Sequence, residues 1–269
     1  MQYAVYFYID KRGRILYMTK RAWIIFAVIC VALIGGLIYM SSMNKVDVAK
    51  VDALKIQSAM DDNGKIADHT FGNTKSKVTL VEYGDYQCPG CGDAYPVIKQ
   101  ITEKYKDQLG FIFRNYPLST LHPNALAAAT VAEEANLQGK FWEMHNKLYE
   151  TQDSWNQLSG SDRTNYFVSL ADTVGIDKNK LESALNGDSS DSNRISKKIN
   201  FDMALGKKQG VSGTPTLYLN GKEVSSEYFK DGKIVPQSVT GAQPVWSDAA
   251  AFDTLVIKPA LQDNGMLSK

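Results

Sequence analysis

The sequence predicts an α/β domain that carries a helical insertion and is preceded by one transmembrane helix. An apolar, β-branched stretch at 78–83 is typical of a buried strand, and helical spacing follows at 93–109. A second strand is expected at 216–219. The long segment between them shows helical patterns, and residues 23–40 form an apolar run without a charge.

The N-terminal apolar run predicts a membrane anchor, because residues 23–40 are long enough to span a bilayer. Basic residues precede the run, namely Lys11, Arg12, Arg14, Lys20 and Arg21. The positive-inside rule therefore places residues 1–22 in the cytoplasm and the rest of the chain outside. A cleaved signal peptide is the alternative, but its apolar core would be shorter and no A-x-A site follows Met40.

The composition fits one extracytoplasmic domain after this anchor. Residues 41–68 are polar and are expected to form a stalk, and residues 69–269 are expected to form the domain. Its helical insertion should span about residues 119–209. The formal net charge of +1 disfavours nucleic acid as a partner.

The tetrapeptide Cys88-Pro89-Gly90-Cys91 is the most informative motif. Two thiols at this spacing can close and reopen a disulfide, which makes them a two-electron redox switch. A zinc site would need a second pair of ligands. The remaining cysteine and the histidines form no such pair: Cys30, His69, His122 and His145. A structural disulfide is a further alternative, although so short a loop gives little stabilisation. We therefore expect a redox pair and no metal.

Cys88 is expected at the N-terminus of a helix, after the strand 78–83 and a turn at 84–87. Unpaired N–H groups and the helix dipole favour an anion there, so the Cys88 thiol should have a depressed pKa. Pro89 suits the first helical turn, where its missing N–H is not needed. Cys91, one turn into the helix, should be more buried and should act as the resolving thiol.

A second motif lies far downstream, where Thr214-Pro215 directly precedes the strand 216–219 and Asn220-Gly221 predicts a hairpin turn. Together with the C-x-x-C, this pattern resembles the thioredoxin superfamily, and most closely its DsbA-like branch. The resemblance covers roughly residues 69–262, and three stretches carry it: 78–91, 113–118 and 210–216. It implies a thioredoxin-like fold with a helical insertion and no cofactor other than the Cys88–Cys91 disulfide.

The resemblance also implies roles for individual residues. Cys88 is similar to the nucleophile and Cys91 to the resolving cysteine. Pro215, with Thr214 before it, is similar to the cis-proline that pairs with an extended substrate backbone. The implied catalytic residues are Cys88, Cys91, Glu82 and Pro215, and the implied substrate contacts are Thr214, Pro215, Pro89 and Gly90.

Glu82, six residues before Cys88, matches the buried acid that moves protons for the resolving cysteine. A carboxylate in a Val/Leu strand should be desolvated and its pKa raised, which suits proton transfer. The alternative is a side chain that points out of an edge strand. Gly90 departs from the family pattern, because strongly oxidising members carry His at this position, and the strength of oxidation is therefore open.

The insertion should contain five helices, at 124–136, 139–151, 162–175, 179–186 and 192–209. An aromatic stripe in the second of them consists of Phe141, Trp142, Met144 and Leu148. Core packing is the preferred interpretation of this stripe, of His122 and of His145, with a substrate groove as the alternative. A closing helix is expected at 246–261, capped by Ser247 or Asp248 and disturbed near its end by Pro259.

The resemblance implies a membrane-anchored thiol–disulfide oxidoreductase that oxidises cysteine pairs in exported proteins. Its implied partners are exported polypeptides with free cysteines and a quinone-linked membrane thiol oxidase of the DsbB or VKOR type. A reductase or isomerase is the alternative, although no dimerisation domain is evident. A binding module or chaperone without catalytic activity is disfavoured by the intact cysteine pair.

Overall fold

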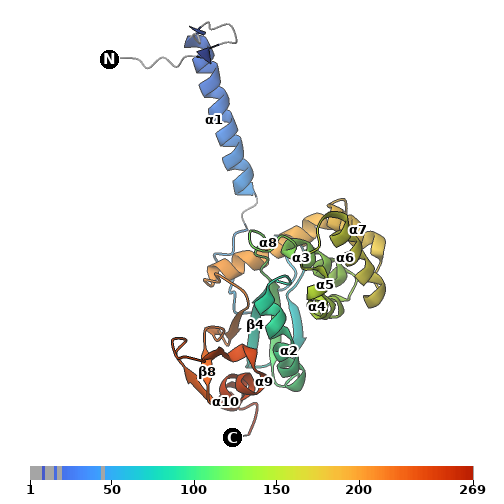
Figure 1. Ribbon diagram of the computed structural model, residues 1–269, viewed down its shortest axis with the longest axis vertical. Helices are drawn as coiled ribbons and strands as arrows, with labels where there is room; N and C mark the ends of the chain where they lie inside the picture. Colours follow the sequence, from blue (N-terminus) through green and yellow to red (C-terminus); the bar gives the residue numbers. More distant parts are fainter. Residues whose placement is uncertain (1–7, 10–14, 17–19, 44–45, 269) are drawn as a thin grey trace, which may run out of the picture. The chain divides into compact units, whose positions relative to one another are not determined.

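Two units make up the chain, Met1–Lys45 and Val46–Lys269. The computed structural model describes residues 8–9, 15–16, 20–43 and 46–268. The first unit contains a short hairpin of β1 (Tyr8–Ile9) and β2 (Ile15–Leu16), and the helix α1 (Lys20–Met43) (Figure 1). Most large apolar side chains between residues 23 and 34 are exposed. Within the described residues, no helix has both the length and the apolarity that crossing a membrane requires, so the predicted span at 23–40 is not confirmed.

A mixed five-stranded sheet forms the centre of the second unit. Its strands, in spatial order, are β3 (His69–Gly72), β5 (Gly110–Asn115), β4 (Thr79–Gly84), β6 (Thr216–Leu219) and β7 (Lys222–Glu223). The central strand β4 runs parallel to β5 and antiparallel to β6. The strands predicted from apolar, β-branched patterns are therefore confirmed to within about a residue.

Side-chain alternation along β4 separates two packing faces. Leu80 belongs to the larger core on the face that α2 (Pro89–Lys104) covers. Val81 and Tyr83 belong to a second cluster, to which α8 (Ser192–Lys208) contributes Phe201. Glu82 alternates with Val81 and Tyr83, so its side chain lies on the α2 face of the sheet.

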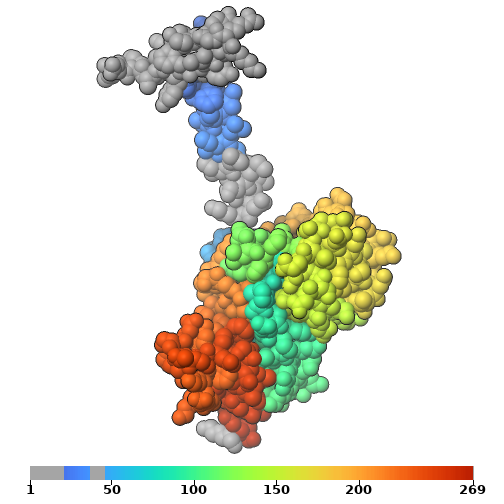
Figure 2. Space-filling view, in the orientation of Figure 1, coloured from blue at the N-terminus to red at the C-terminus, as the bar shows by residue number. Residues whose placement is uncertain are grey.

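The predicted insertion is helical. Its helices are α3 (Ala125–Leu137), α4 (Phe141–Glu150), α5 (Gln152–Trp155), α6 (Gly160–Val174), α7 (Lys178–Asn186) and α8. Figure 2 shows the yellow part of this insertion, which contains α6 and α7, and the red C-terminal elements on opposite sides of the middle of the second unit. Phe141, Met144 and Leu148 are buried, which confirms core packing for these three residues of the aromatic stripe.

The C-terminal part contains the predicted closing helix, and strands that the sequence did not predict precede it. A three-stranded sheet precedes it, with β10 (Gln243–Pro244), β8 (Tyr228–Lys230) and β9 (Lys233–Val235) in that order. After the 3-10 turn η2 (Val245–Ser247), the helix runs without a gap through α9 (Ala249–Phe252), the π turn η3 (Asp253–Ile257) and α10 (Lys258–Asp263). Pro259 has no N–H and lies in the first turn of α10, directly after the π turn, which is the disturbance predicted near the end of the helix. Asp248 is the cap, since its carboxylate accepts a 2.8 Å hydrogen bond from the N–H of Ala251.

Residues 46–68, which the sequence assigns to a stalk, are part of the second unit. The buried guanidinium of Arg114 donates hydrogen bonds to the carbonyl oxygens of Ala53 and Lys55. It also forms a 2.7 Å ion pair with Asp68, which lies 3.2 Å from the buried ammonium of Lys198. The predicted boundary at residue 69 is therefore too late, because the preceding segment satisfies a buried charge.

Candidate active site

Cys88 occupies the N-cap of α2, which begins at Pro89, as the sequence predicts. The carbonyl oxygen of Cys88 accepts hydrogen bonds of 3.1 Å from the N–H groups of Cys91 and Gly92. When it is protonated, the Cys88 thiol donates to the carbonyl oxygen of Thr214 at 3.3 Å. The nucleophile candidate is thus held between the helix start and a loop that lies far along the chain.

The two thiols have opposite electrostatic environments. A hydrogen bond from the Cys91 thiol, together with the N–H groups of Cys91 and Gly90, lowers the pKa of Cys88 from 9.0 to about 5. Burial raises the pKa of Cys91 well above its ordinary value, and the neighbouring Cys88 and Glu82 raise it further. At neutral pH, Cys88 is therefore a thiolate and Cys91 is a thiol.

The Thr214–Pro215 peptide bond is cis, and its loop faces the C-x-x-C. A Cβ added to Gly90 would lie 3.4 Å from Cδ of Pro215 and 3.8 Å from Sγ of Cys88. Pro89, by contrast, is exposed to solvent. The structure therefore brings the expected substrate-contact residues Thr214, Pro215, Pro89 and Gly90 around the Cys88 sulfur.

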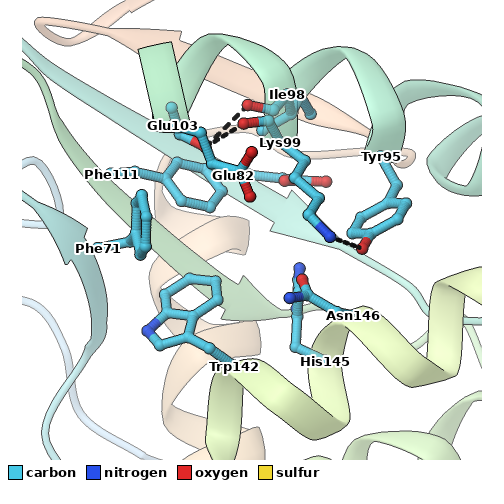
Figure 3. Close-up of a pocket in the computed structure, with 11 residues that line it drawn as sticks. Phe71, Glu82, Tyr95, Ile98, Lys99, Glu103, Phe111, Trp142, His145 and Asn146 are labelled. Atoms are coloured by element: carbon cyan, nitrogen blue, oxygen red, sulfur yellow. Dashed lines mark hydrogen bonds between the residues drawn. The ribbon is translucent and has the colours of Figure 1, made fainter. Parts of the chain in front are cut away.

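Glu82 lies on the central strand, which excludes the alternative of an outward-pointing side chain on an edge strand. Only 3% of the residue is exposed, and desolvation raises its pKa from 4.5 to about 8. Figure 3 shows its carboxylate in a pocket beside Phe111 and Lys99. Among the residues that the structure describes, none donates a hydrogen bond to this carboxylate. A buried, protonated acid close to Cys91 is a suitable proton donor.

His145 lines the same pocket, and the structure gives it a buried position. Its Nδ1 lies 3.0 Å from the hydroxyl of Tyr86, and its ring packs against Phe113 with centroids 4.6 Å apart. Desolvation lowers the pKa of His145 to about 3, so the ring is neutral. This matches the predicted core position.

Asp85 organises the turn before the cysteines, and the sequence pattern gave no sign of it. Its carboxylate accepts hydrogen bonds from the N–H groups of Gln87 at 2.8 Å and Leu118 at 2.9 Å. Nδ1 of His122 lies 2.7 Å from the same carboxylate, so His122 has a specific polar partner and is not simply packed in the core. The N–H of Asp85 lies 3.5 Å from Sγ of Cys91. Asp85 therefore connects the loop of His122 to the resolving thiol.

Gln152 is a second residue that sequence reasoning missed. It belongs to α5 of the insertion, and its Nε2 donates to the carbonyl oxygens of Tyr86 at 2.7 Å and Cys88 at 2.9 Å. A Cβ on Gly92 would lie 2.5 Å from the Gln152 amide, so a larger residue at this position would displace the Gln152 side chain. Apolar periodicity does not distinguish Gln152 from other glutamines, because its hydrogen-bond partners belong to another segment of the chain.

Residues 65–233, more than half of the chain, match the protein family described as Thioredoxin. The chain belongs to the thioredoxin family. Cys88 and Cys91 both lie within the region of this thioredoxin-family chain that the family matches.

Two solved structures share the fold of this thioredoxin-family chain. BdbD from Bacillus subtilis is 22% identical with a TM-score of 0.53, and the match covers 77% of this chain and 97% of that one. Alpha-DsbA1 from Wolbachia pipientis is 21% identical with a TM-score of 0.53, and covers 73% and 94%. The expected fold, with DsbA-like structural neighbours, is therefore confirmed.

Curated relatives match a shorter region. The Na(+)/H(+) antiporter NhaA 1 of Mycolicibacterium vanbaalenii is 34% identical over 154 residues, which covers 57% of this chain and 23% of the relative. NhaA 3 of Salinispora tropica is 35% identical over 161 residues, which covers 60% and 23%. The chain thus spans about a quarter of the length of these relatives.

The arrangement determines the chemistry of this thioredoxin-family chain. A low-pKa thiolate beside a buried thiol can exchange with a disulfide and then close a ring with its neighbour. The Cys88–Cys91 pair is therefore equipped for thiol–disulfide exchange.

Proposed function

We propose that this chain is a thiol–disulfide oxidoreductase that oxidises cysteine pairs in exported polypeptides. A substrate thiolate attacks Sγ of Cys88 in the oxidised protein, a mixed disulfide forms, and Cys91 leaves as a thiolate that takes up a proton. The second substrate thiolate then attacks the substrate sulfur of the mixed disulfide and expels Cys88 as a thiolate. Two electrons pass to the cysteine pair, and the substrate gains a disulfide.

The low pKa of Cys88 is the observation that carries this proposal. A thiolate stabilised at the N-cap exists only in the reduced protein, so the environment of Cys88 favours reduction of the pair. A disulfide that is readily reduced is an oxidant for other thiols. The same low pKa makes Cys88 a good leaving group in the second step.

We assign the proton in the first step to Glu82. Its pKa of about 8 keeps the carboxyl group protonated at neutral pH, and its charge contributes to the raised pKa of Cys91. It can therefore donate a proton as Cys91 leaves and recover it from water in the pocket. We further propose that Thr214 and Pro215 bind the substrate backbone next to Cys88.

We place the redox domain outside the cytoplasm, with residues 1–22 inside and the apolar segment 23–40 as a membrane tether. This part of the proposal depends on the sequence: basic residues precede an uncharged apolar run. Each turnover leaves the pair reduced, so a reoxidising partner is required. A quinone-linked membrane thiol oxidase of the DsbB or VKOR type would serve.

The equilibrium constant of the Cys88–Cys91 pair with glutathione tests the direction of the reaction. We expect an oxidising pair, whose disulfide is largely reduced by millimolar glutathione. A pair that resists glutathione would instead assign the protein to the reductases. Protease added to spheroplasts tests the location, and digestion from Val46 onward is the expected result.

A further inference from the structure

A buried hydroxyl group on the helical insertion has no role in the exchange chemistry of the two thiols. It belongs to Tyr149 on α4, and only 5% of this residue is exposed. Among the residues that the structure describes, none forms a hydrogen bond with the hydroxyl oxygen. A hydroxyl group that is buried without a partner costs free energy, so its position requires an explanation.

Gly84, at the end of β4, locates this hydroxyl group. A Cβ added to Gly84 would lie 3.0 Å from Oη of Tyr149. Because side chains alternate along a strand, that Cβ would point to the same face of the sheet as Glu82, which is the face that α2 covers. The N–H of the next residue, Asp85, lies 3.5 Å from Sγ of Cys91. The hydroxyl oxygen and the sulfur therefore approach adjacent residues of one segment.

Aromatic packing fixes the ring that carries the hydroxyl group. The ring centroid of Tyr149 lies 4.9 Å from that of Tyr86 and 5.2 Å from that of Tyr95. The ring also meets Phe113 edge to face, with centroids 6.4 Å apart. A phenylalanine would keep these contacts, so packing explains the ring but not the hydroxyl group.

The hydroxyl group stays protonated at neutral pH. Burial raises the pKa of Tyr149 well above its ordinary value of 10.0, and the charges of Cys91 and Glu82 raise it further. An O–H group can donate one hydrogen bond while it accepts another. It can therefore pass a proton on without a change in its own charge.

Glu82 and Cys91 have no direct connection. The charge of Glu82 acts on Cys91 through space, but in the part of the chain that the structure describes no hydrogen bond joins the carboxyl group to Sγ. Proton transfer requires hydrogen-bond reach, either directly or through an intervening group. The Tyr149 hydroxyl group lies on the same face of the sheet and is free to act as that group.

We propose that Tyr149 relays the proton between Glu82 and Cys91. This inference rests on the proposed function and adds the carrier of the proton to it. When a substrate thiolate breaks the Cys88–Cys91 disulfide, Sγ of Cys91 leaves as a thiolate. The Tyr149 hydroxyl group gives its proton to this sulfur and takes the proton of the Glu82 carboxyl group. Cys91 ends as a thiol, Glu82 as a carboxylate, and Tyr149 is unchanged.

Tyr149→Phe tests the relay, because it removes the hydroxyl group and keeps the ring. Single-turnover reduction of the oxidised protein by dithiothreitol at neutral pH follows the step in which Cys91 leaves. The variant should carry out this step about tenfold more slowly than the wild-type protein. Its melting temperature should not fall, since the lost hydroxyl group has no hydrogen-bond partner among the described residues.

A double variant tests whether Tyr149 acts through Glu82. Glu82→Gln should slow the same step, and the addition of Tyr149→Phe should slow it no further, because groups in one relay act in series. Losses that multiply in the double variant would show that the two residues act independently and would overturn the proposal.

Tyr105→Phe is the matched control. Tyr105 is also 5% exposed, but its hydroxyl group donates a 2.7 Å hydrogen bond to Asp253, and it lies at the other end of α2. This variant should melt at a lower temperature and keep the wild-type rate. An unchanged rate in Tyr149→Phe, or a fall in its melting temperature as large as that of the control, would overturn the proposal. Dithiothreitol left unoxidised by the wild-type protein would instead reject the proposed function itself.

Discussion

Nε2 of Gln152 donates a 2.9 Å hydrogen bond to the carbonyl oxygen of Cys88. The same nitrogen donates to the carbonyl oxygen of Tyr86 at 2.7 Å. Gln152 lies in the helical insertion, whereas both carbonyl groups belong to the turn that leads into α2. The insertion is therefore part of the redox site and not an appendage to it.

Gln152→Leu should destabilise the protein by about 1–3 kcal/mol, because the buried carbonyl group of Tyr86 loses its donor. Urea unfolding of the reduced protein measures this change. Gln100→Leu is the control, since Gln100 is exposed on α2. Equal losses in both variants would show that the hydrogen bonds of Gln152 contribute nothing specific.

Cys91→Ala should accumulate mixed disulfides with substrate polypeptides, because Cys88 can still attack but nothing resolves the product. Cys88→Ala should accumulate far fewer, since the pKa of the buried Cys91 thiol is raised. Non-reducing electrophoresis after alkylation counts the adducts. Similar amounts in the two variants would reverse or abolish the assignment of the nucleophile.

The reduced protein should be more stable than the oxidised protein at neutral pH, and the difference should depend on pH. The folded pKa of Cys88 is about 5, below its ordinary value of 9.0, so thiolate formation stabilises the reduced fold as pH rises. The contribution is complete above pH 9.0 and is lost as pH falls through about 5. Melting curves of both redox forms should therefore converge near pH 4 (roughly one unit below that pKa), and a constant difference would contradict the low pKa.

Glu82→Gln should slow the step in which Cys91 leaves or attacks, and should remove a rate dependence near pH 8. The carboxyl pKa is raised from 4.5 to about 8, so ionisation destabilises the fold progressively between these values. The variant should therefore gain up to about 3 kcal/mol of stability at pH 7.

Glu103→Gln is the matched control for Glu82, because Glu103 lines the same pocket but is exposed. Single-turnover kinetics from pH 5 to pH 9 (roughly the range around the raised pKa of Glu82) separates the two variants. If Glu103→Gln changed the pH profile as much as Glu82→Gln, the proton could not be assigned to Glu82.

A chain that begins at residue 46 should fold, whereas one that begins at residue 69 should lose several kcal/mol or fail to fold. The shorter chain lacks Asp68 and the carbonyl groups of Ala53 and Lys55, so the Arg114 guanidinium would be buried without its partners. Circular dichroism and urea unfolding of both chains give the result. Equal stability would show that residues 46–68 only cover the surface.

Periodic patterns predicted most of the elements that carry the site. A strand or helix that is buried on one face repeats its apolar residues with the period of that element. This pattern predicted the strand Thr216–Leu219 and the helices of the insertion. Strands of two or three residues, such as β7 and β10, are too short to show alternation. The closing helix followed from its apolar spacing, and the lack of an N–H at Pro259 predicted the local disturbance, which the structure shows as the π turn before α10.

The reacting cysteines were predictable from the sequence, but the groups that support them were not. Glu82, Cys88 and Cys91 belong to one strand–turn–helix segment, β4 to α2. Their order along the sequence therefore predicts that they lie close together in space. Gln152 and Asp85 act through hydrogen bonds across sequence separations that no local pattern encodes. The predicted start of the domain at residue 69 was wrong for the same reason. The carbonyl groups that accept hydrogen bonds from Arg114 belong to a polar segment that is far from Arg114 in the sequence.

The Cys88 sulfur lies at the N-cap of α2, between the Thr214 carbonyl group and the insertion. This position determines when a newly synthesised chain becomes reactive. Before folding, Cys88 and Cys91 are two ordinary thiols, each with the ordinary pKa of 9.0 and little thiolate at neutral pH. Thr214 also lowers the pKa of Cys88 and is 126 residues away from it, so this contact arises only after most of the chain has been synthesised. A nascent copy is therefore a poor nucleophile, and reactivity toward other thiols develops only with completed folding.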